Sequence, residues 1–373
     1  MSMGVTRDPD RPVRALHLVG PMNRGGVESW LMTLLRHADR RVLALDLLTT
    51  AEQPAAYDEE IRSLGARLLR LPPASPLSYR SKLLGLLRAY GPYDAVHSHL
   101  HFFSGWPLLA ARQAEVPVRA ITSHIDSRSL DRQASRLRHV YHAAARQLIL
   151  RSANRKMAVS PEAAAALYGD GWMRRGVTIE RLGLDLSALR TLSARDETLR
   201  ELGLPTDEPV LLSVGRLDKA KNHLFLLDVF AAFLAHHGRG QLLLAGEGPE
   251  RKHIERRRAE RGLTERVHLL GSRPDVPRLL HAADVFILPS LYEGLALALV
   301  EAQVVGLPCV IAGQLTPASR LPGAFYRTPF LTDDLSVWVD ALNQALAAGR
   351  RPGDGSAFDV RTNIQSLLKV YRA

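Results

Sequence analysis

Short apolar segments alternate with helical ones along this chain, and this alternation constrains the fold more than any other feature. In the first half, amphipathic patterns such as YRSKLLGLLRAY (79–90) separate the apolar segments. The candidate strands there are residues 13–20, 44–50, 66–72, 94–100, 119–124 and 155–160. Apolar strands that alternate with helices are typical of a parallel sheet covered on both faces. The first half is therefore predicted to be a doubly wound α/β domain.

The same alternation starts again near residue 209. The candidate strands of the second half are 209–215, 241–249, 267–272, 285–290 and 308–313. The predicted fold class is α/β, with two doubly wound Rossmann-like domains facing each other across a cleft, because such folds bind ligands at the carboxyl ends of their strands. The expected divisions are a disordered leader (1–12), an N-terminal domain (13–191), a linker (192–208), a C-terminal ligand-binding domain (209–350) and a C-terminal helix (351–373) that can pack back on the N-terminal domain.

Cysteine content and hydropathy indicate the compartment. Cys309 is the only cysteine, so an intramolecular disulfide is impossible and a structural zinc site is improbable. No apolar run approaches the roughly 18–20 residues of a membrane span, and the N-terminal segment lacks the apolar centre of a signal peptide. We expect a cytoplasmic protein.

Positive charge is concentrated in the first half. The chain carries a net charge of +11; residues 1–200 hold 29 Lys and Arg against 19 Asp and Glu, and the other 173 hold 20 against 19. Arg128, Arg132 and Arg136 recur every four residues on an expected helix. Either the first half meets an anionic partner such as a membrane surface, or these residues form a solvated basic face and reflect Arg-rich codon usage.

Two cations follow the first strand of the second half. Arg216 and Lys221 stand five residues apart in VGRLDKAKN, at the start of the next helix. A helix N-terminus and two cations suit a diphosphate, although a solvated turn such as the one that holds Lys219 is the alternative. In the first half, Gly25 and Gly26 form a strand–helix loop that lets backbone approach a phosphate or sugar.

Two carboxylates flank the start of an apolar helix in EGLALALVEAQVVGLP (293–308). If Gly294 opens the helix, Glu293 lies before it and Glu301 about two turns inside, up to roughly 12 Å away. This spacing could span a nucleotide-sugar, one acid on the sugar hydroxyls and the other on the ribose, with the N–H groups of Gly294 and Leu295 in reach. The alternative is one acid at a helix N-terminus and one on its surface.

These motifs carry a family resemblance. VGRLDKAKNHLFLLDVF, LLLAGEGPE, VHLLGSRPDVPRLLHAADVFILPSLYEG and the two-glutamate helix resemble the nucleotide-binding domain of family-4-type retaining glycosyltransferases of the GT-B fold (glycosyl transferases group 1). The first half is similar more loosely, through GGVESWLMTLLRH, PYDAVHSHLHFFSG and AITSHIDSRS. The variants in this chain look most like bacterial capsular and exopolysaccharide transferases.

The resemblance implies a role for each matched residue. Arg216 and Lys221 would hold the donor diphosphate, Glu293 the donor sugar and Glu301 the ribose. Gly26, with Gly25, would approach the donor phosphates from the N-terminal domain. His124 would lie near the transferring sugar and the backbone around Arg273 near the base. If the residues contact the ligand in this way, Glu293→Gln should leave the affinity for a nucleoside diphosphate nearly unchanged.

The resemblance also implies the chemistry. Transfer would retain anomeric configuration by leaving-group-assisted front-face attack, without an enzyme nucleophile, a metal or another cofactor. The acceptor would be a glycan or a polyprenyl-diphosphate-linked sugar, at the inner face of the cytoplasmic membrane. The chain departs from relatives at Ala296 and Ala298, which puts donor-sugar contacts in doubt, and at Leu182, where relatives have Asn.

Several alternatives stay open. His97, His99 and His101 alternate on a strand, which allows a metal site, but an acceptor-side or structural role for His99 is favoured, with Arg128 as another acceptor-side candidate. A GT-B sugar-nucleotide epimerase and a non-enzymatic nucleic-acid binder are the other functions considered; the near-neutral second half speaks against nucleic acid. The sequence does not specify the base, the sugar, the acceptor or the oligomeric state.

Overall fold

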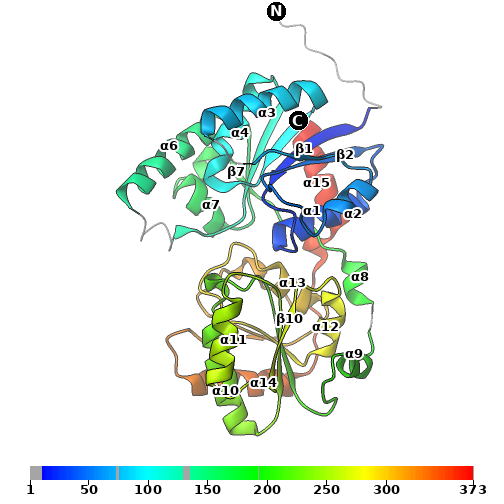
Figure 1. Cartoon of the computed structure of the whole chain (residues 1–373), viewed down its shortest axis with the longest axis vertical. Coiled ribbons are helices and arrows are strands. Elements are labelled where there is room, and N and C mark those ends of the chain that lie inside the picture. The colour runs from blue at the N-terminus through cyan, green and yellow to red at the C-terminus, as the bar shows by residue number, and fades with distance from the viewer. Residues whose placement is uncertain (1–10, 73–74, 129–134, 192, 373) are drawn as a thin grey trace, which may run out of the picture. The chain divides into compact units, whose positions relative to one another are not determined.

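The computed structural model describes residues 11–72, 75–128, 135–191 and 193–372, which form two compact units (Figure 1). The first unit contains the described residues up to Asn23, then Val27–Gly183, then those from Val360 onward. The second unit contains Arg24–Gly26 and Leu184–Asp359. The chain thus leaves the first unit after Gly183 and returns to it at Val360.

The first unit is built on a seven-stranded parallel sheet in the order β3-β2-β1-β4-β5-β6-β7. All six candidate strands of the first half are present, and the sheet adds one that was not predicted, the short edge strand β7. The strands are β1 (Val13–Val19), β2 (Leu43–Thr49), β3 (Leu68–Arg70), β4 (Ala95–Ser98), β5 (Val118–Ser123), β6 (Arg155–Ala158) and β7 (Val177–Ile179).

Helices cover this sheet, and several begin where the sequence supplies a cap. Ser160 accepts a hydrogen bond from Ala163 N at the start of α7, and Pro161 follows it in the first turn. The helices are α1 (Gly26–His37), α2 (Asp58–Ser63), α3 (Pro76–Tyr90), α4 (Gly105–Gln113), α6 (Arg136–Ser152), α7 (Pro161–Tyr168) and α15 (Val360–Arg372), with 3-10 turns η1 (His101–Ser104) and η2 (Met173–Arg175).

The second unit repeats the design with six parallel strands in the order β10-β9-β8-β11-β12-β13. The five candidate strands are present, and β13 is again a short edge strand that was not predicted. They are β8 (Val210–Val214), β9 (Gln241–Ala245), β10 (Val267–Gly271), β11 (Val285–Leu288), β12 (Cys309–Ile311) and β13 (Tyr326–Arg327). The order reverses at β8, so the loops after β8 and β11 diverge at the switch point where such sheets bind ligands.

Helices precede, separate and follow the strands of the second unit in the sequence. They are α8 (Leu186–Arg190), α9 (Arg195–Glu201), α10 (His223–His237), α11 (Arg251–Glu260), α12 (Val276–Ala282), α13 (Leu297–Val304) and α14 (Leu335–Ala348), with 3-10 turns η3 (Lys219–Lys221), η4 (Pro317–Ser319) and η5 (Ser356–Phe358).

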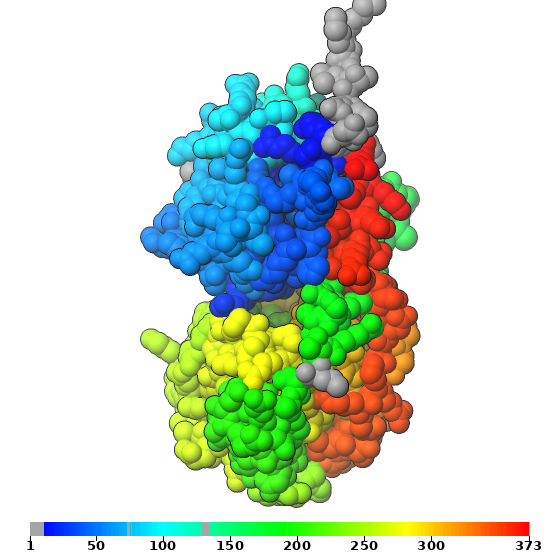
Figure 2. Space-filling model, turned by 90° about the vertical axis from the view of Figure 1, so that its right-hand side faces the viewer, coloured from blue at the N-terminus to red at the C-terminus, as the bar shows by residue number. Residues whose placement is uncertain are grey.

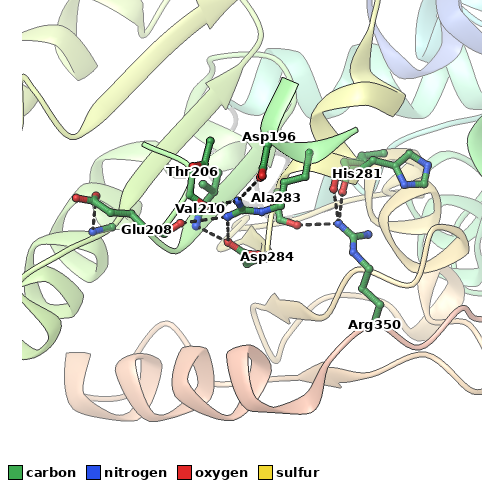
Figure 3. A network of polar contacts seen from close by, with 11 residues as sticks. Asp196, Thr206, Glu208, Val210, His281, Ala283, Asp284 and Arg350 are labelled. Carbon is green, nitrogen blue, oxygen red and sulfur yellow. Dashed lines mark hydrogen bonds and ion pairs between the residues drawn. The ribbon is translucent and has the colours of Figure 1, made fainter. Parts of the chain in front are cut away.

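The segment before β8 is fixed to the sheet by polar contacts (Figure 3). Arg195 donates to the carbonyl oxygen of Thr206 (2.6 Å) and forms an ion pair with Asp284 (3.0 Å between Nη2 and Oδ2). Asp284 also accepts from Val210 N at 2.8 Å, at the first residue of β8. Arg350, after α14, donates to the carbonyl oxygens of His281 and Ala283, both at 2.8 Å. Two arginines therefore join peripheral segments to the centre of the second unit.

The C-terminal helix α15 completes the first unit, and Figure 2 shows its residues (red) against the N-terminal ones (blue). Asn363 anchors it with three hydrogen bonds: it accepts from Trp30 Nε1 (2.8 Å) and Gly183 N (3.2 Å) and donates to Arg181 O (2.7 Å). The side chains of Trp30 and Asn363 are buried. The two ends of the chain therefore meet in one unit.

Two remaining expectations concern the termini and membranes. The leader expected over 1–12 lies outside the described residues as far as Asp10, and Arg11 pairs with Asp94 (2.6 Å). None of the helices in the described part of the chain is long and apolar enough to cross a membrane.

Candidate active site

Three loops at the carboxyl edge of the second sheet are joined backbone to backbone. Gly215 N donates to Ala245 O (3.0 Å), Leu217 N to Glu247 O (2.9 Å), and Gly246 N to Gly271 O (2.8 Å). The approach is so close that a Cβ added to Gly246 would lie 1.9 Å from the carbonyl oxygen of Gly215. The glycines at these strand ends therefore let the three loops pack closely against one another, and these loops hold the charged residues in place.

Lys221 is held in place by its local structure. It ends the turn η3, where the Asp218 side chain accepts from Lys221 N at 3.3 Å, and Asn222 then takes a left-handed conformation (φ 55°) before α10 begins. The lysine stem passes Gly215, where an added Cβ would lie 2.9 Å from Lys221 Cε. A glycine at 215 is thus a condition for the position of the ammonium group.

Lys221 and Glu293 form an ion pair, with 2.6 Å between Nζ and Oε1. The side chains are only 18% and 12% exposed. Their loops are also joined directly, because Leu291 N donates to Ala220 O at 2.7 Å. The sequence assigned these two residues to different parts of a ligand, whereas the structure brings the ammonium and the carboxylate together. Each therefore neutralises the other in the absence of a ligand.

Arg216 lies beside this pair in the chain and is exposed. Its guanidinium makes no hydrogen bond or ion pair with the described residues.

Near Lys221 and Glu293 in sequence, two buried atoms are also without partners in the described part of the chain, Ser290 Oγ and His223 Nδ1. Burial, followed by the charge of Lys221, lowers the pKa of His223 to about 4, so its ring is neutral at pH 7. His223 was not a sequence candidate.

The two-glutamate helix begins later than predicted. It starts at Leu297 rather than Gly294, because Ala296 has non-helical dihedral angles (φ −82°, ψ 85°) and its N–H donates to Ser319 Oγ at 2.8 Å. Gly294 and Leu295 thus lie in the loop, and Glu301 is in the second turn instead of two turns inside. The Glu301 carboxyl is partly exposed, and burial raises its pKa to about 7.

Arg273 follows β10 and is held by its own loop. Its guanidinium donates to both oxygens of Asp275, at 2.8 and 2.7 Å. This bidentate contact fixes the loop whose backbone the resemblance places near the base. In the first half, Gly26 opens α1, and Gly25 precedes it.

Four histidines at the carboxyl edge of the first sheet are linked into one hydrogen-bonded chain. Its members, in order, are Thr122, His97, Tyr371, His17, His99 and His124. We call this set the histidine chain. β1, β4 and β5 and the loops after β4 and β5 supply five members, and α15 supplies Tyr371.

The sequence identified only part of this cluster. His101 was grouped with His97 and His99 as alternating strand residues, but β4 ends at Ser98 and His101 begins η1 with a positive φ of 49°. Ring nitrogens of His17, His97 and His99 lie within 4.8 Å of one another. Both ring nitrogens of each already bond within the histidine chain, so a metal ion there would have to break those bonds. A histidine inside the apolar strand VRALHLV was the available signal for His17.

Two of the three evenly spaced arginines of the first half lie in the described part of the chain. Arg128 pairs with Asp126 (2.8 Å), and Arg136 starts α6. Arg132 lies outside the described residues. The predicted helical face of three arginines therefore lies partly outside the described residues.

Comparison with known proteins identifies the family of the chain and agrees with the fold. Residues 194–319 match the glycosyl transferases group 1 family, and residues 25–182 match the glycosyl transferase 4-like domain. A relative over nearly the whole length is the "Putative glycosyltransferase EpsF" of Bacillus subtilis, 37% identical over 372 residues, covering 96% of each chain. The chain belongs to the group 1 glycosyltransferases and is an enzyme of that class.

Two further relatives and one solved structure extend the comparison. The capsular polysaccharide biosynthesis glycosyltransferase CapH of Staphylococcus aureus is 23% identical, covering 96% of this chain and 98% of its own. A UDP-Gal:alpha-D-GlcNAc-diphosphoundecaprenol alpha-1,3-galactosyltransferase of Escherichia coli is 29% identical over 59% of this chain and 58% of its own. Anabaena HepE in complex with UDP-glucose superposes with a TM-score of 0.76 at 20% identity, covering 96% and 99%. The fold is GT-B, and the reaction class is glycosyl transfer rather than epimerisation or non-enzymatic nucleic-acid binding.

Proposed function

We propose that this enzyme transfers a sugar, with retention of configuration, from a nucleoside diphosphate donor to a glycan or polyprenyl-diphosphate-linked acceptor. The observation that carries the proposal is the Lys221–Glu293 ion pair at the switch point of the second sheet, with Arg216 beside it in sequence. A bound diphosphate would take Lys221 away from Glu293 and would recruit Arg216. The carboxylate of Glu293 would then be free to accept hydrogen bonds from the sugar hydroxyls.

The proposed reaction needs no enzyme nucleophile. The acceptor oxygen bonds to the anomeric carbon on the face from which the diphosphate leaves, and the acceptor proton passes to a departing phosphate oxygen. Lys221 and Arg216 stabilise the negative charge that grows on the diphosphate as the old bond breaks. The two cations supply the stabilisation that a metal provides elsewhere, so we propose metal-independent transfer.

A thermal-shift screen of the purified protein against UDP-, GDP- and ADP-sugars tests the donor class. One donor series should raise Tm, and that donor should be consumed when a diphospho-lipid sugar acceptor is added, with equal rates in chelator and in Mg²⁺ or Mn²⁺. No shift with any nucleotide-sugar would refute the donor proposal. Turnover that chelator abolishes and a metal ion restores would refute the metal-independent mechanism.

We also propose that the enzyme acts in cell-surface polysaccharide biosynthesis, at the inner face of the cytoplasmic membrane. Two kinds of support are available: relatives named for capsule synthesis and for a diphosphoundecaprenol acceptor, and the exposed start of α6. There Leu137 is 83% and Val140 67% exposed, next to Arg136 and Arg138. Apolar side chains among arginines on one helix suit an anionic lipid surface.

Liposome flotation at low salt tests membrane binding. The wild-type protein should float with anionic vesicles and stay behind with neutral ones, and Leu137→Ser should weaken flotation. Val337→Ser is the matched control, since Val337 is an exposed valine of α14 near Asp334 and Asp340 in sequence. Equal recovery with both kinds of vesicle would contradict membrane binding. Solubility alone would then explain the basic charge.

A further inference from the structure

The histidine chain runs without a break from a strand hydroxyl to an unpartnered ring nitrogen. Thr122 Oγ1 lies 2.8 Å from His97 Nε2, and His97 Nδ1 lies 2.6 Å from the hydroxyl of Tyr371. That hydroxyl lies 3.1 Å from His17 Nε2. Every polar side-chain atom in this first half of the histidine chain therefore has a neighbour at hydrogen-bond distance.

The second half of the histidine chain consists of rings only. His17 Nδ1 lies 3.0 Å from His99 Nε2, and His99 Nδ1 lies 2.8 Å from His124 Nε2. His124 Nδ1, the last atom, is buried and has no hydrogen-bond partner among the described residues. Buried polar groups are rarely left unpaired in a native protein, so this nitrogen is expected to bond to a water molecule or a ligand.

All four rings are neutral at pH 7. Burial lowers the pKa of His17 and of His124 to about 3. Burial and the neighbouring histidines hold the pKa of His97 and of His99 well below the ordinary value. A neutral imidazole has one N–H donor and one bare nitrogen acceptor. Each ring can therefore donate on one side only.

This restriction makes the hydrogen bonds directional. If a ring accepts at one nitrogen, it must donate at the other, so the direction of one bond sets the direction of the next. The Tyr371 hydroxyl transmits the direction in the same way, since it accepts from one ring and donates its single hydrogen to the other. The histidine chain as a whole therefore has two states, one that leaves His124 Nδ1 with a hydrogen and one that leaves it bare.

Thr122 decides between the two states. Its side chain is buried, and among the described residues its hydroxyl has His97 Nε2 as its only partner. A hydroxyl always has a hydrogen to donate, and a buried donor without an acceptor costs about 1–3 kcal/mol. Thr122 therefore donates to His97, and the direction runs from there to the other end. The final ring keeps its hydrogen on Nδ1.

We infer that the histidine chain fixes His124 as the Nδ1–H tautomer, and that this N–H donates to an oxygen of the bound glycosyl donor. His124 is the residue that touches the ligand, and the five others are positioning residues. Tyr371 is the link between His97 and His17. The ligand contact rests on the proposed function, whereas the tautomer does not.

Nitrogen NMR of the full chain labelled with ¹⁵N-histidine tests the tautomer directly, because protonated and bare ring nitrogens resonate in separate regions. The signals of His124 are assigned by their loss in His124→Gln. The wild-type protein should show a protonated Nδ1 and a bare Nε2. The opposite tautomer, or His17, His97 and His99 bound to a stoichiometric transition metal in the purified protein, would overturn the inference.

Tyr371→Phe tests transmission. Without the hydroxyl, the direction set by Thr122 no longer reaches His17, and His124 should become a mixture of tautomers. The control is Tyr168→Phe, because Tyr168 is equally buried next to the same sheet but donates to the backbone at Met157 O (2.9 Å). It should leave the His124 tautomer unchanged. An unchanged tautomer in Tyr371→Phe would overturn the inference.

Thr122 provides the second pair of variants. Thr122→Val removes the donor that sets the direction and should give the same mixture, whereas Thr122→Ser keeps the hydroxyl and should restore the single tautomer. In each mixed variant kcat should fall in proportion to the lost tautomer, about two- to tenfold. A mixed tautomer with unchanged kcat would overturn the ligand contact. A single wild-type tautomer in a protein that binds no nucleotide-sugar would refute the proposed function and leave the tautomer standing.

Discussion

At the residue scale, the ammonium group of Lys221 and the carboxylate of Glu293 contact each other, although the sequence assigned them to different parts of a donor. Lys221 and Glu293 lie 2.6 Å apart in a largely buried setting. At the proposed donor site, a ligand diphosphate would compete with a carboxylate for the same ammonium group. This competition alters what each substitution should do, compared with a view in which the two residues act independently.

Lys221→Ala should lower kcat by about 10²–10³, because it removes a preorganised cation from the departing diphosphate, a contact worth about 3–4 kcal/mol. Nucleoside diphosphate affinity should fall as well, since the product retains that contact. Donor kinetics and calorimetry with the diphosphate alone measure the two effects. Unchanged diphosphate affinity would show that Lys221 lies away from the phosphates.

Glu293→Gln should separate binding from transfer. The substitution frees Lys221 from a charged partner, so diphosphate affinity should stay the same or rise, because the diphosphate no longer competes with a carboxylate. Turnover should fall, because the sugar hydroxyls lose a charged acceptor. Calorimetry on this variant and on Lys221→Ala gives the comparison. If both lost affinity equally, Glu293 would serve to hold Lys221 in position.

Glu301 should make stability depend on pH near neutrality. Its pKa is about 7 in the folded chain and near the ordinary value of 4.5 when unfolded, so the folded state binds more protons between these values. Stability therefore falls as pH rises from about 4.5 to 7. Glu301→Gln should abolish that part of the dependence, on the order of 2 kcal/mol by pH 8. Parallel pH–Tm curves for wild type and variant would contradict this.

At the element scale, the arginine contacts around β8 explain how a short polar helix becomes part of the second unit. α9 is exposed over much of its length, and Arg195 joins it to Thr206 and Asp284 (Figure 3). The sequence suggested a linker helix here and did not distinguish this arginine from its neighbours, because the partner Asp284 is 89 residues away.

Arg195→Met should destabilise the protein by about 2 kcal/mol, because it leaves Asp284 without its cation and Thr206 O without its donor. Arg200→Met is the control: Arg200 is on the same helix and exposed, and its guanidinium makes no hydrogen bond or ion pair with the described residues. Thermal denaturation should lower Tm for the first variant only, by about 4–8 °C. Equal Tm values would mean that the ion pair contributes nothing net.

The sequence predicts elements well and their junctions poorly. The buried strands were visible because a parallel sheet demands continuous apolar runs, while β7 and β13 were missed because edge strands are short and half exposed. The start of α13 was misplaced because the hydrogen bond from Ala296 to Ser319 is a tertiary contact. The cations and carboxylates were proposed from their spacing and their places near strand ends, and their roles stay predictions. His17 and Tyr371 were not, because only the fold brings β1 and α15 together.

At the scale of the whole molecule, the first unit depends on the last residues of the chain. Asn363→Ala should destabilise it by about 3 kcal/mol, since it leaves the buried N–H groups of Trp30 and Gly183 unpaired. Asn343→Ala is the control, because Asn343 makes one exposed hydrogen bond, to His237. Chemical denaturation of both variants measures the difference. A cost below about 1 kcal/mol for Asn363→Ala would mean that water replaces the amide.

The return of α15 also sets an order of events during synthesis. All of the strands of the first unit emerge before any strand of the second, yet Asn363 and Tyr371 emerge after both sheets are complete. At about 5–20 residues per second, the ribosome delivers them roughly 10–40 s after Gly183. During that interval, α15 does not yet cover Trp30 or the histidine rings of β1 and β4 in the newly made first sheet. Until α15 has been made, the hydroxyl of Tyr371 cannot link His97 to His17, so the inferred tautomer of His124 is not yet fixed.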